Sequence, residues 1–281
     1  MKTNWILASA SSIGKAHLEN SLPCQDSFKV KKLSRNCGIT IIADGAGSCS
    51  HSQLGSKYLV ENGISLFSTE LIKTKFLKKK KPLRKDHWRK LVLRCFDQLQ
   101  SGLSELADKR NIQLKDISST IIVVAFSPLG IMSAHIGDGR AAFCDKKLEW
   151  KPIIKPFSGD EAGTTVFFTT KVVWEQPTEY IKTKIIKDEI TGFSLLSDGM
   201  EKISYECYVK DRETEYYKDP NKPFPGFFNS IRKSLIEMSK ENWSQKKINK
   251  QWKLFLTKGN QSIIDEPDDK TMIVGILKNS L

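Results

Sequence analysis

Three aspartates in this chain end apolar, strand-like runs, and each of them is followed by a glycine. They are Asp44, Asp138 and Asp198. A further acidic pair, Asp268-Asp269, comes just before the last apolar run of the sequence. Carboxylates at strand ends, beside glycines that let the backbone turn sharply, are typical ligands of a hard divalent cation. Because tens of residues separate these positions, only the fold can bring them together.

A single Asp-Gly pair is weak support for a cation site, since the same dipeptide is common in ordinary turns. Here the pair recurs three times at the ends of apolar runs, and Asp26 and Asp268 add two more carboxylates. The recurrence favours a shared site over unrelated turns.

The elements that must position these residues follow from the hydrophobic pattern. Strands are predicted near residues 4–10, 28–33, 38–43, 121–126, 131–137, 140–144, 148–150, 164–170, 192–197 and 271–277. Helices are predicted over residues 52–72, 87–109, 224–240 and 244–257. Two consecutive helices among many hairpin-like strands indicate a layered α+β domain. We expect residues 1–281 to form one domain, with an irregular insertion at about 205–225.

The composition excludes several classes of protein. No apolar stretch approaches the roughly 20 residues that span a bilayer, and the N-terminal apolar run is too short for a signal peptide. The six cysteines are scattered without metal-ligand spacing, which argues against zinc and for reduced thiols. We therefore expect a cytoplasmic protein that does not contact membranes.

The net charge of +13 is concentrated in the segment 73–90, which joins the first two predicted helices. This segment has ten Lys or Arg residues and one acid, Asp86. It reads either as a solvated loop or as a contact for an acidic partner. Without aromatic interleaving or a nucleic-acid motif, specific nucleic-acid recognition is not expected.

Motif order makes the chain similar to a known family. The matching stretches are residues 24–28, 42–47, 118–120, 136–140, 196–199 and 268–271. In this order and spacing they resemble the metal-dependent protein phosphatase 2C family of serine/threonine phosphatases, in particular its compact bacterial branch. The resemblance extends from about residue 5 to residue 277.

The resemblance implies a fold and a set of site residues. The implied fold has two antiparallel β-sheets packed as a central sandwich and flanked by helices on both sides. Two Mn²⁺ or Mg²⁺ ions, with a weaker third, and no organic cofactor are implied. The implied metal ligands are Asp44, Gly45 (through its carbonyl), Asp198, Asp268, Asp138 and Gln25. The implied catalytic residues are Asp26, Asp44 and Asp198.

The function implied by the resemblance is hydrolysis of phosphoserine and phosphothreonine by a metal-activated water. The substrate would be a phosphorylated protein, the opposing enzyme a serine/threonine kinase in a signalling system, and the phosphatase a monomer. The alternative is a pseudophosphatase, in which the fold serves as a regulatory binding module with weakened metal binding.

Two departures from the family pattern support that alternative. Gln25 stands where an acidic ligand commonly precedes Asp26, and Ser21 stands where a phosphate-binding arginine is expected. His17 and Lys15 are the candidate replacements for the arginine.

Other positions carry competing interpretations. Lys202 takes the place of an additional third-metal aspartate, and Asp269 stands where asparagine is usual, so that we favour Asp268 as the ligand. His135 lies within a predicted strand and is expected to be a core or cleft histidine. Arg140 is expected to be an ion-pair partner and not a phosphate ligand.

Overall fold

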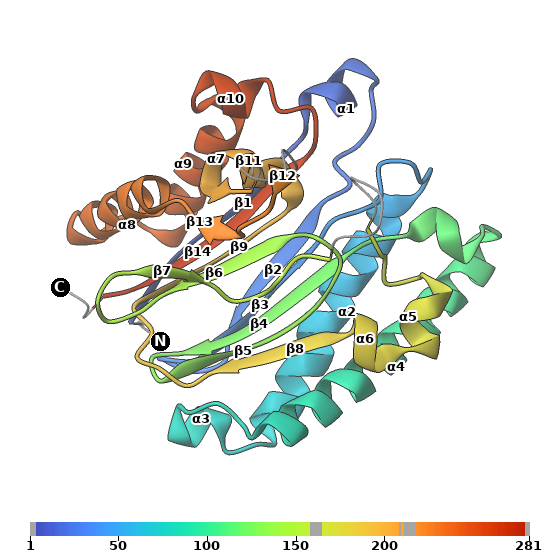
Figure 1. Cartoon of the computed structure of the whole chain (residues 1–281), viewed down its shortest axis with the longest axis horizontal. Coiled ribbons are helices and arrows are strands. Elements are labelled where there is room, and N and C mark those ends of the chain that lie inside the picture. The colour runs from blue at the N-terminus through green and yellow to red at the C-terminus, as the bar shows by residue number, and fades with distance from the viewer. Residues whose placement is uncertain (1–3, 158–164, 208, 211–216, 279–281) are drawn as a thin grey trace.

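Two five-stranded antiparallel sheets form the centre of the molecule (Figure 1). The computed structural model describes residues 4–157, 165–207, 209–210 and 217–278. The first sheet contains, in spatial order, β1 (Trp5–Ser12), β14 (Lys270–Leu277), β9 (Gly192–Leu196), β6 (Arg140–Cys144) and β7 (Trp150–Pro152). The second contains β2 (Ser27–Lys32), β3 (Gly38–Ala43), β4 (Ile121–Ser127), β5 (Gly130–Ile136) and β8 (Lys182–Ile186).

Four long helices cover the outer faces of the sheets. α2 (Ser52–Ile72) and α4 (Lys85–Arg110) pack on the second sheet, and α8 (Pro225–Lys240) and α9 (Gln245–Lys258) pack on the first (Figure 1). The short helices are α1 (Lys15–Glu19), α3 (Phe76–Lys79), α5 (Lys171–Glu175), α6 (Pro177–Tyr180), α7 (Glu201–Ser204) and α10 (Gln261–Ile264), with 3₁₀ turns η1 (Leu114–Ile117) and η2 (Asp198–Met200). Short strands β10 (Tyr205–Glu206), β11 (Val209–Lys210), β12 (Tyr217–Lys218) and β13 (Lys222–Pro223) pair in twos.

The apolar side chains divide into three layers, as the alternation of residues along the strands requires. Between the two sheets, Trp5, Phe126 and Phe193 pack in mutual contact, with ring centroids 4.4–5.4 Å apart. One outer layer lies between the second sheet and the helices α2 and α4. The other lies between the first sheet and the helices α8 and α9. The predicted sandwich with helices on both sides is therefore confirmed.

The sequence prediction differs from the structure in some elements. Of the segment predicted as a strand at 164–170, residues 165–170 form no strand, and they turn into α5 with a Thr170 N–H to Phe167 carbonyl bond of 3.0 Å. Edge strand β8 was not predicted, because its residues alternate between exposed lysines and half-buried side chains. Within the described residues, no helix is long and apolar enough to cross a membrane.

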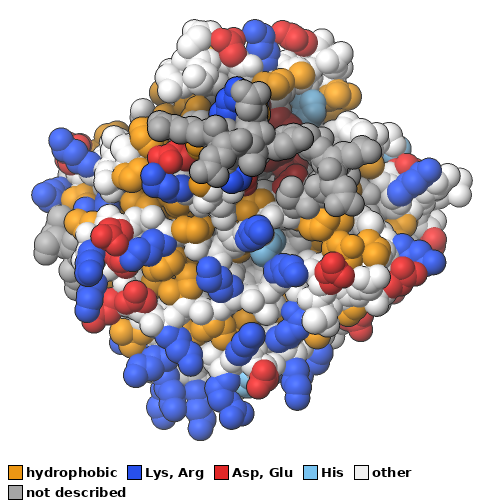
Figure 2. Space-filling model, in the orientation of Figure 1, with side chains coloured by type: hydrophobic (Ala, Val, Ile, Leu, Met, Phe, Trp, Pro, Cys, Tyr) orange, Lys and Arg blue, Asp and Glu red, His pale blue; other side chains and the backbone are white. Residues whose placement is uncertain are grey.

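The basic segment 73–90 lies far from the strand ends that carry the aspartates. It begins where α2 ends, and a helix of 21 residues is roughly 30 Å long. Figure 2 shows a dense group of Lys and Arg side chains at the end of the molecule where α3 lies. All six cysteines are free thiols.

Candidate active site

The topology brings the acidic strand ends to one end of the sandwich. In the second sheet, β3 and β5 are both antiparallel to β4 and therefore run in the same direction. Asp44 and Asp138, which follow these strands, thus lie at the same end of the sheet. Asp26 comes just before β2, whose first residue pairs with the last residue of β3. In the first sheet, the start of β14 pairs with the end of β9, which places Asp268 beside Asp198.

The backbone around Asp44 is held by the start of β4. The Asp44 carbonyl accepts hydrogen bonds from the Thr120 N–H at 2.7 Å and from the Ser119 hydroxyl at 2.7 Å. The Asp44 N–H in turn donates to the Thr120 hydroxyl at 3.2 Å. The small polar residues 118–120 therefore fix the main chain of Asp44 and leave its carboxylate free to face the site.

Asp26 is buried and is positioned from the other sheet. The Ser197 hydroxyl donates to Asp26 Oδ2 at 2.8 Å, and the Thr271 N–H donates to the same hydroxyl at 3.0 Å. The other carboxylate oxygen of Asp26 is buried without a hydrogen-bond partner among the described residues. One oxygen is thus held by the protein, and the other remains available as a ligand or acceptor.

Asp269 is a structural residue. Its side chain, 1% exposed, accepts from the Gly14 N–H at 2.7 Å and from the Gln25 N–H at 2.6 Å. Asp268 uses Oδ1 to accept from the Asp269 N–H at 2.7 Å. Since both oxygens of Asp269 already accept from backbone donors, Asp268 is the member of the pair that can serve as a metal ligand.

Two glycines allow the loops to approach closely. A Cβ atom at Gly45 would lie 2.8 Å from the Gln25 carbonyl, and one at Gly199 would lie 2.2 Å from the Asp269 carbonyl. Any larger residue would force the strand ends apart. The glycine that follows each aspartate therefore has a packing role at Asp44 and Asp198.

The pKa values of four aspartates at this end of the sandwich are raised. Burial is the largest cause, and the neighbouring negative charges add to it. The pKa of Asp26 rises to about 7 and that of Asp198 to about 8. The pKa of Asp44 lies well above its ordinary value, owing to burial and to the charges of Asp26, Asp198, Asp268 and Asp138. Burial also raises the pKa of Asp138. So much negative charge in one place favours cation binding.

The side chains nevertheless do not form a closed cage. Across the described ranges, no three Asp, Glu, His or Cys side chains lie close enough together to enclose a metal ion. The donor chemistry does fit a hard cation, because three buried oxygens lack hydrogen-bond partners among the described residues. These are Gln25 Oε1, Asp26 Oδ1 and Asp198 Oδ1. An oxygen-rich, acidic site of this kind suits Mg²⁺ or Mn²⁺.

Three basic residues that the sequence analysis named near the site each lie against an acidic side chain. Lys202 Nζ lies 3.6 Å from Glu266, and Lys15 Nζ lies 3.1 Å from Asp265. His17 Nδ1 lies 3.0 Å from Asp269 Oδ1, although the contact is not aligned as a hydrogen bond. Both candidate replacements for the missing arginine therefore already contact acids.

Arg140 is an ion-pair partner, as predicted. Its buried guanidinium lies 2.8 Å from Glu201 and 3.0 Å from Asp219, and it donates to Asn221 at 2.9 Å. These bonds tie β6 to α7 and to the segment before β13. The guanidinium also lies over the ring of Tyr205, 5.1 Å from its centroid, so that it has no free donor face for a phosphate.

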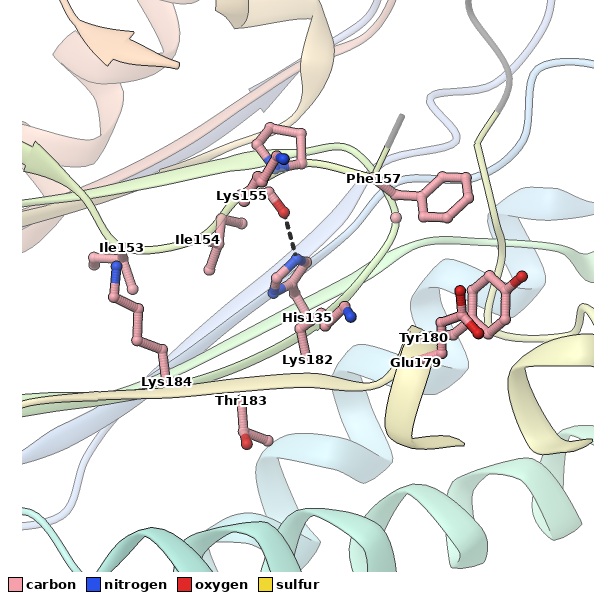
Figure 3. Close-up of a pocket in the computed structure, with 12 residues that line it drawn as sticks. His135, Ile153, Ile154, Lys155, Phe157, Glu179, Tyr180, Lys182, Thr183 and Lys184 are labelled. Carbon is pink, nitrogen blue, oxygen red and sulfur yellow. Dashed lines mark hydrogen bonds between the residues drawn. The ribbon is translucent and has the colours of Figure 1, made fainter. Parts of the chain in front are cut away.

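A cavity of about 520 Å³ lies beside the site, where Gly137 links β5 to Asp138 (Figure 3). His135 is buried in its wall, as predicted, and its Nε2 lies 2.9 Å from the Lys155 carbonyl. Nε2 must therefore carry the proton, and burial lowers the pKa of His135 to about 4. Lys155, Lys182 and Lys184 also line the cavity. Sequence reasoning missed these lysines, because Lys182 and Lys184 reach the cavity only through the pairing of β8 with β5, and Lys155 reaches it from the segment that follows β7.

Comparison with known proteins agrees with this arrangement. A sequence model of the protein phosphatase 2C family matches residues 13–251. Serine/threonine-protein phosphatase 3 of Escherichia coli (strain K12) is 22% identical over 238 residues, which is 83% of this chain and 86% of that protein.

Solved structures share the fold at low sequence identity. The serine/threonine phosphatase of S. agalactiae superimposes with a TM-score of 0.59 at 14% identity, covering 97% of this chain and 99% of that one. Serine/threonine phosphatase Stp1 from Staphylococcus aureus gives a TM-score of 0.56 at 14% identity, covering 96% and 94%. The matched residues include every strand of the second sheet, three strands of the first and all but the last of the acidic strand ends, and the chain therefore belongs to the protein phosphatase 2C family, whose members are metal-dependent serine/threonine phosphatases.

Proposed function

We propose that this protein hydrolyses phosphoserine and phosphothreonine in proteins, using two Mn²⁺ or Mg²⁺ ions held at the acidic end of the sandwich. The observation that supports this most strongly is the convergence of five aspartates at one end of the sandwich, where burial and the neighbouring charges raise the pKa values of Asp26, Asp44 and Asp198. Asp44, the Gly45 carbonyl, Asp198 and Asp268 would hold the two ions. Asp138 would help to hold a weaker third ion, and Gln25 would supply a neutral oxygen ligand.

When bound, the ions would neutralise phosphate charge and lower the pKa of water for in-line attack. The chain's own residues prepare the site for this. Asp26, with one oxygen fixed by Ser197 and the other unpartnered, can accept a proton from water. Lys155, Lys182 and Lys184 place positive charge beside the site, which favours the approach of phosphorylated side chains.

We further propose that the protein acts as a cytoplasmic monomer and opposes a serine/threonine kinase in a signalling system. Two departures from the family pattern support one other function, a regulatory module that binds phosphoproteins without turnover. Ser21 stands in place of the phosphate-binding arginine, and the neutral Gln25 stands in place of an acidic ligand. Both hypotheses use the same fold, so that only activity separates them.

The test is hydrolysis of p-nitrophenyl phosphate with Mn²⁺, with Mg²⁺ and with excess EDTA. We expect activity only with metal, and a loss of more than tenfold in Asp44→Ala, equivalent to about 1.4 kcal/mol or more in the barrier. Asp198→Ala should behave similarly. Asp97→Ala on the exposed face of α4 is the matched control and should retain activity.

A second readout does not depend on turnover. Mn²⁺ should raise the melting temperature of the wild type and of Asp97→Ala but raise it much less in Asp44→Ala. Metal-dependent stabilisation without hydrolysis would identify the regulatory module, and activity that persists in EDTA would refute the proposed mechanism.

A further inference from the structure

β1 is an edge strand of the first sheet, and β2 is an edge strand of the second. Both lie on the same side of the sandwich, next to each other (Figure 1). At one end they are joined by a 3.2 Å bond from the Asn4 N–H to the Arg35 carbonyl. The free edge of β1 is covered by α9, since Gln245 Nε2 donates to the Leu7 carbonyl at 2.6 Å and Asn249 Oδ1 accepts from the Ser9 N–H at 3.4 Å.

The outer edge of β2 has no such cover. The Leu33 N–H donates to the Cys37 carbonyl at 3.0 Å, and bonded pairs alternate along an antiparallel ladder. Lys29 and Lys31 therefore bond to β3, and the N–H and C=O groups of Phe28, Val30 and Lys32 point away from the sheet. Within the described part of the chain, no residue hydrogen-bonds to these outward groups.

A groove of about 1920 Å³ runs along this open edge, between α2 and α9. Half-buried Phe28 and Val30 line it, and exposed Leu18 and Leu254 add apolar surface. The groove also reaches Asp26, which immediately precedes β2. An occupant lying along the six residues of β2 would cover about 20 Å and would end at the acidic site.

The charge of the groove selects the occupant. Eight lysines line it, against the two acids Asp26 and Glu61. The lysines that come from β2, α2 and α9 include Lys29, Lys31, Lys57, Lys246, Lys250 and Lys253. None of these six forms an ion pair with another described residue.

Lysines on an edge strand also prevent unwanted pairing of sheets. The lysines of β2 would serve this role, because two copies of this basic strand would repel each other. This role does not account for the apolar surface, the volume of the groove or the seven groove-lining residues that α9 contributes from Lys246 to Leu254. A strand of opposite charge would gain both main-chain hydrogen bonds and ionic contacts here.

We propose that this groove binds an extended acidic segment of the phosphoprotein substrate, which adds to β2 as an outer strand and leads the phosphorylated residue to the site. Main-chain bonds to Phe28, Val30 and Lys32 would supply affinity, and the lysines would supply selectivity. The inference rests on the proposed function for turnover, whereas binding of the acidic segment can be measured without it.

Binding is measured by fluorescence anisotropy with a labelled eight-residue peptide of alternating glutamate and valine. We expect binding that weakens with added salt, and no binding of the matching lysine-valine peptide. The double variant Lys31→Glu, Lys250→Glu should weaken binding at least tenfold. Lys78→Glu with Lys79→Glu, in the basic segment 73–90, makes the same change in net charge and should alter binding less than threefold.

Strand addition is tested separately from charge. Val30→Pro removes an outward N–H without breaking the ladder to β3, and it should weaken binding at least tenfold. Val30→Ala removes the side chain but keeps the N–H, and it should weaken binding less than threefold. If Val30→Pro does not fold, peptides N-methylated on one or the other alternate set of amides replace it. Only the set that faces β2 should lose affinity.

The kinetic arm compares p-nitrophenyl phosphate with a phosphopeptide that carries the acidic extension. The Lys31→Glu, Lys250→Glu variant should raise KM at least fivefold for the extended peptide and leave the small substrate unaffected. Metal-dependent hydrolysis of the small substrate with no peptide binding would overturn the groove and leave the phosphatase. Peptide binding without any hydrolysis would overturn the phosphatase and leave the groove. A dimer of the wild type that Val30→Pro abolishes would replace the peptide by a second copy of the chain.

Discussion

The N–H of Gln25 donates a 2.6 Å hydrogen bond to Asp269, so the residue before Asp26 is held by the residue after Asp268. This bond joins segments 244 residues apart. The two adjacent aspartates therefore have different roles, because both carboxylate oxygens of Asp269 accept from distant backbone N–H groups, whereas Asp268 uses only Oδ1, for the N–H of its neighbour Asp269.

Exchanging each aspartate for asparagine should separate these roles. Asp269→Asn leaves one acceptor oxygen for two backbone donors, and we expect a loss of about 1–3 kcal/mol in the free energy of unfolding. Asp268→Asn should leave stability nearly unchanged and lower metal-dependent activity more than tenfold. Denaturant unfolding without metal and p-nitrophenyl phosphate kinetics measure the two effects, and equal destabilisation by both variants would contradict the assignment.

Gln25 should lower the affinity of the site for the metal ion that it faces. Its side-chain oxygen is buried without a partner among the described residues, and an amide lacks the charge of a carboxylate. Gln25→Glu should therefore lower the Mn²⁺ concentration for half-maximal activity. In metal-free protein the same change should lower the melting temperature, because it adds a negative charge to the acidic cluster.

Titrations of Mn²⁺ at fixed substrate and pH compare the two proteins. Superimposable curves would mean that Gln25 only bonds the neighbouring loop. Gln53→Glu, at another glutamine whose Oε1 is buried without a partner among the described residues, serves as the control for the added charge.

Ser197 should act as a positioning residue for Asp26. Ser197→Ala removes the 2.8 Å bond to Asp26 and the acceptor for the Thr271 N–H, so we expect kcat to fall and stability to drop by about 1–2 kcal/mol. Ser194 lies in β9, three residues before Ser197, and its buried hydroxyl has no partner among the described residues. Ser194→Ala should leave both quantities nearly unchanged, and an equal loss of kcat in the two variants would argue against positioning.

His135 should make the protein sensitive to acid. Its pKa in the folded protein is about 4, below the ordinary 6.5, so the unfolded chain binds the extra proton between these values. The contribution of neutral His135 is complete above pH 6.5 and is lost as the pH falls towards 4, by about 3 kcal/mol. His135→Gln cannot take up this proton. The stability difference between wild type and variant should therefore shrink as the pH falls from 7 to 4, and a constant difference would show that His135 does not titrate there.

The long helices and the layered α+β class were predictable because apolar residues recur with a clear period, whereas the sandwich of two sheets was predicted from the family resemblance. Helix α2 begins and ends where the sequence placed it, at residues 52 and 72. The bonds of Asp269 could not be predicted, since its partners are the backbone N–H groups of Gly14 and Gln25, which carry no side-chain signature. Lys182 and Lys184, which line the cavity beside His135, come from an edge strand that is half exposed and therefore lacks an apolar run.

The pairing of β1 with β14 has a consequence for synthesis. Trp5 lies opposite Leu277, and β14 also separates β1 from β9. During synthesis, β1 has no hydrogen-bonded strand beside it until β14 emerges from the ribosome. The backbone donors of Gly14 and Gln25 likewise lack their acceptor until Asp269 has been made. Contacts this distant in sequence form late and slowly. A partly made chain therefore has no assembled acidic site, and it cannot dephosphorylate proteins before its own translation has passed residue 277.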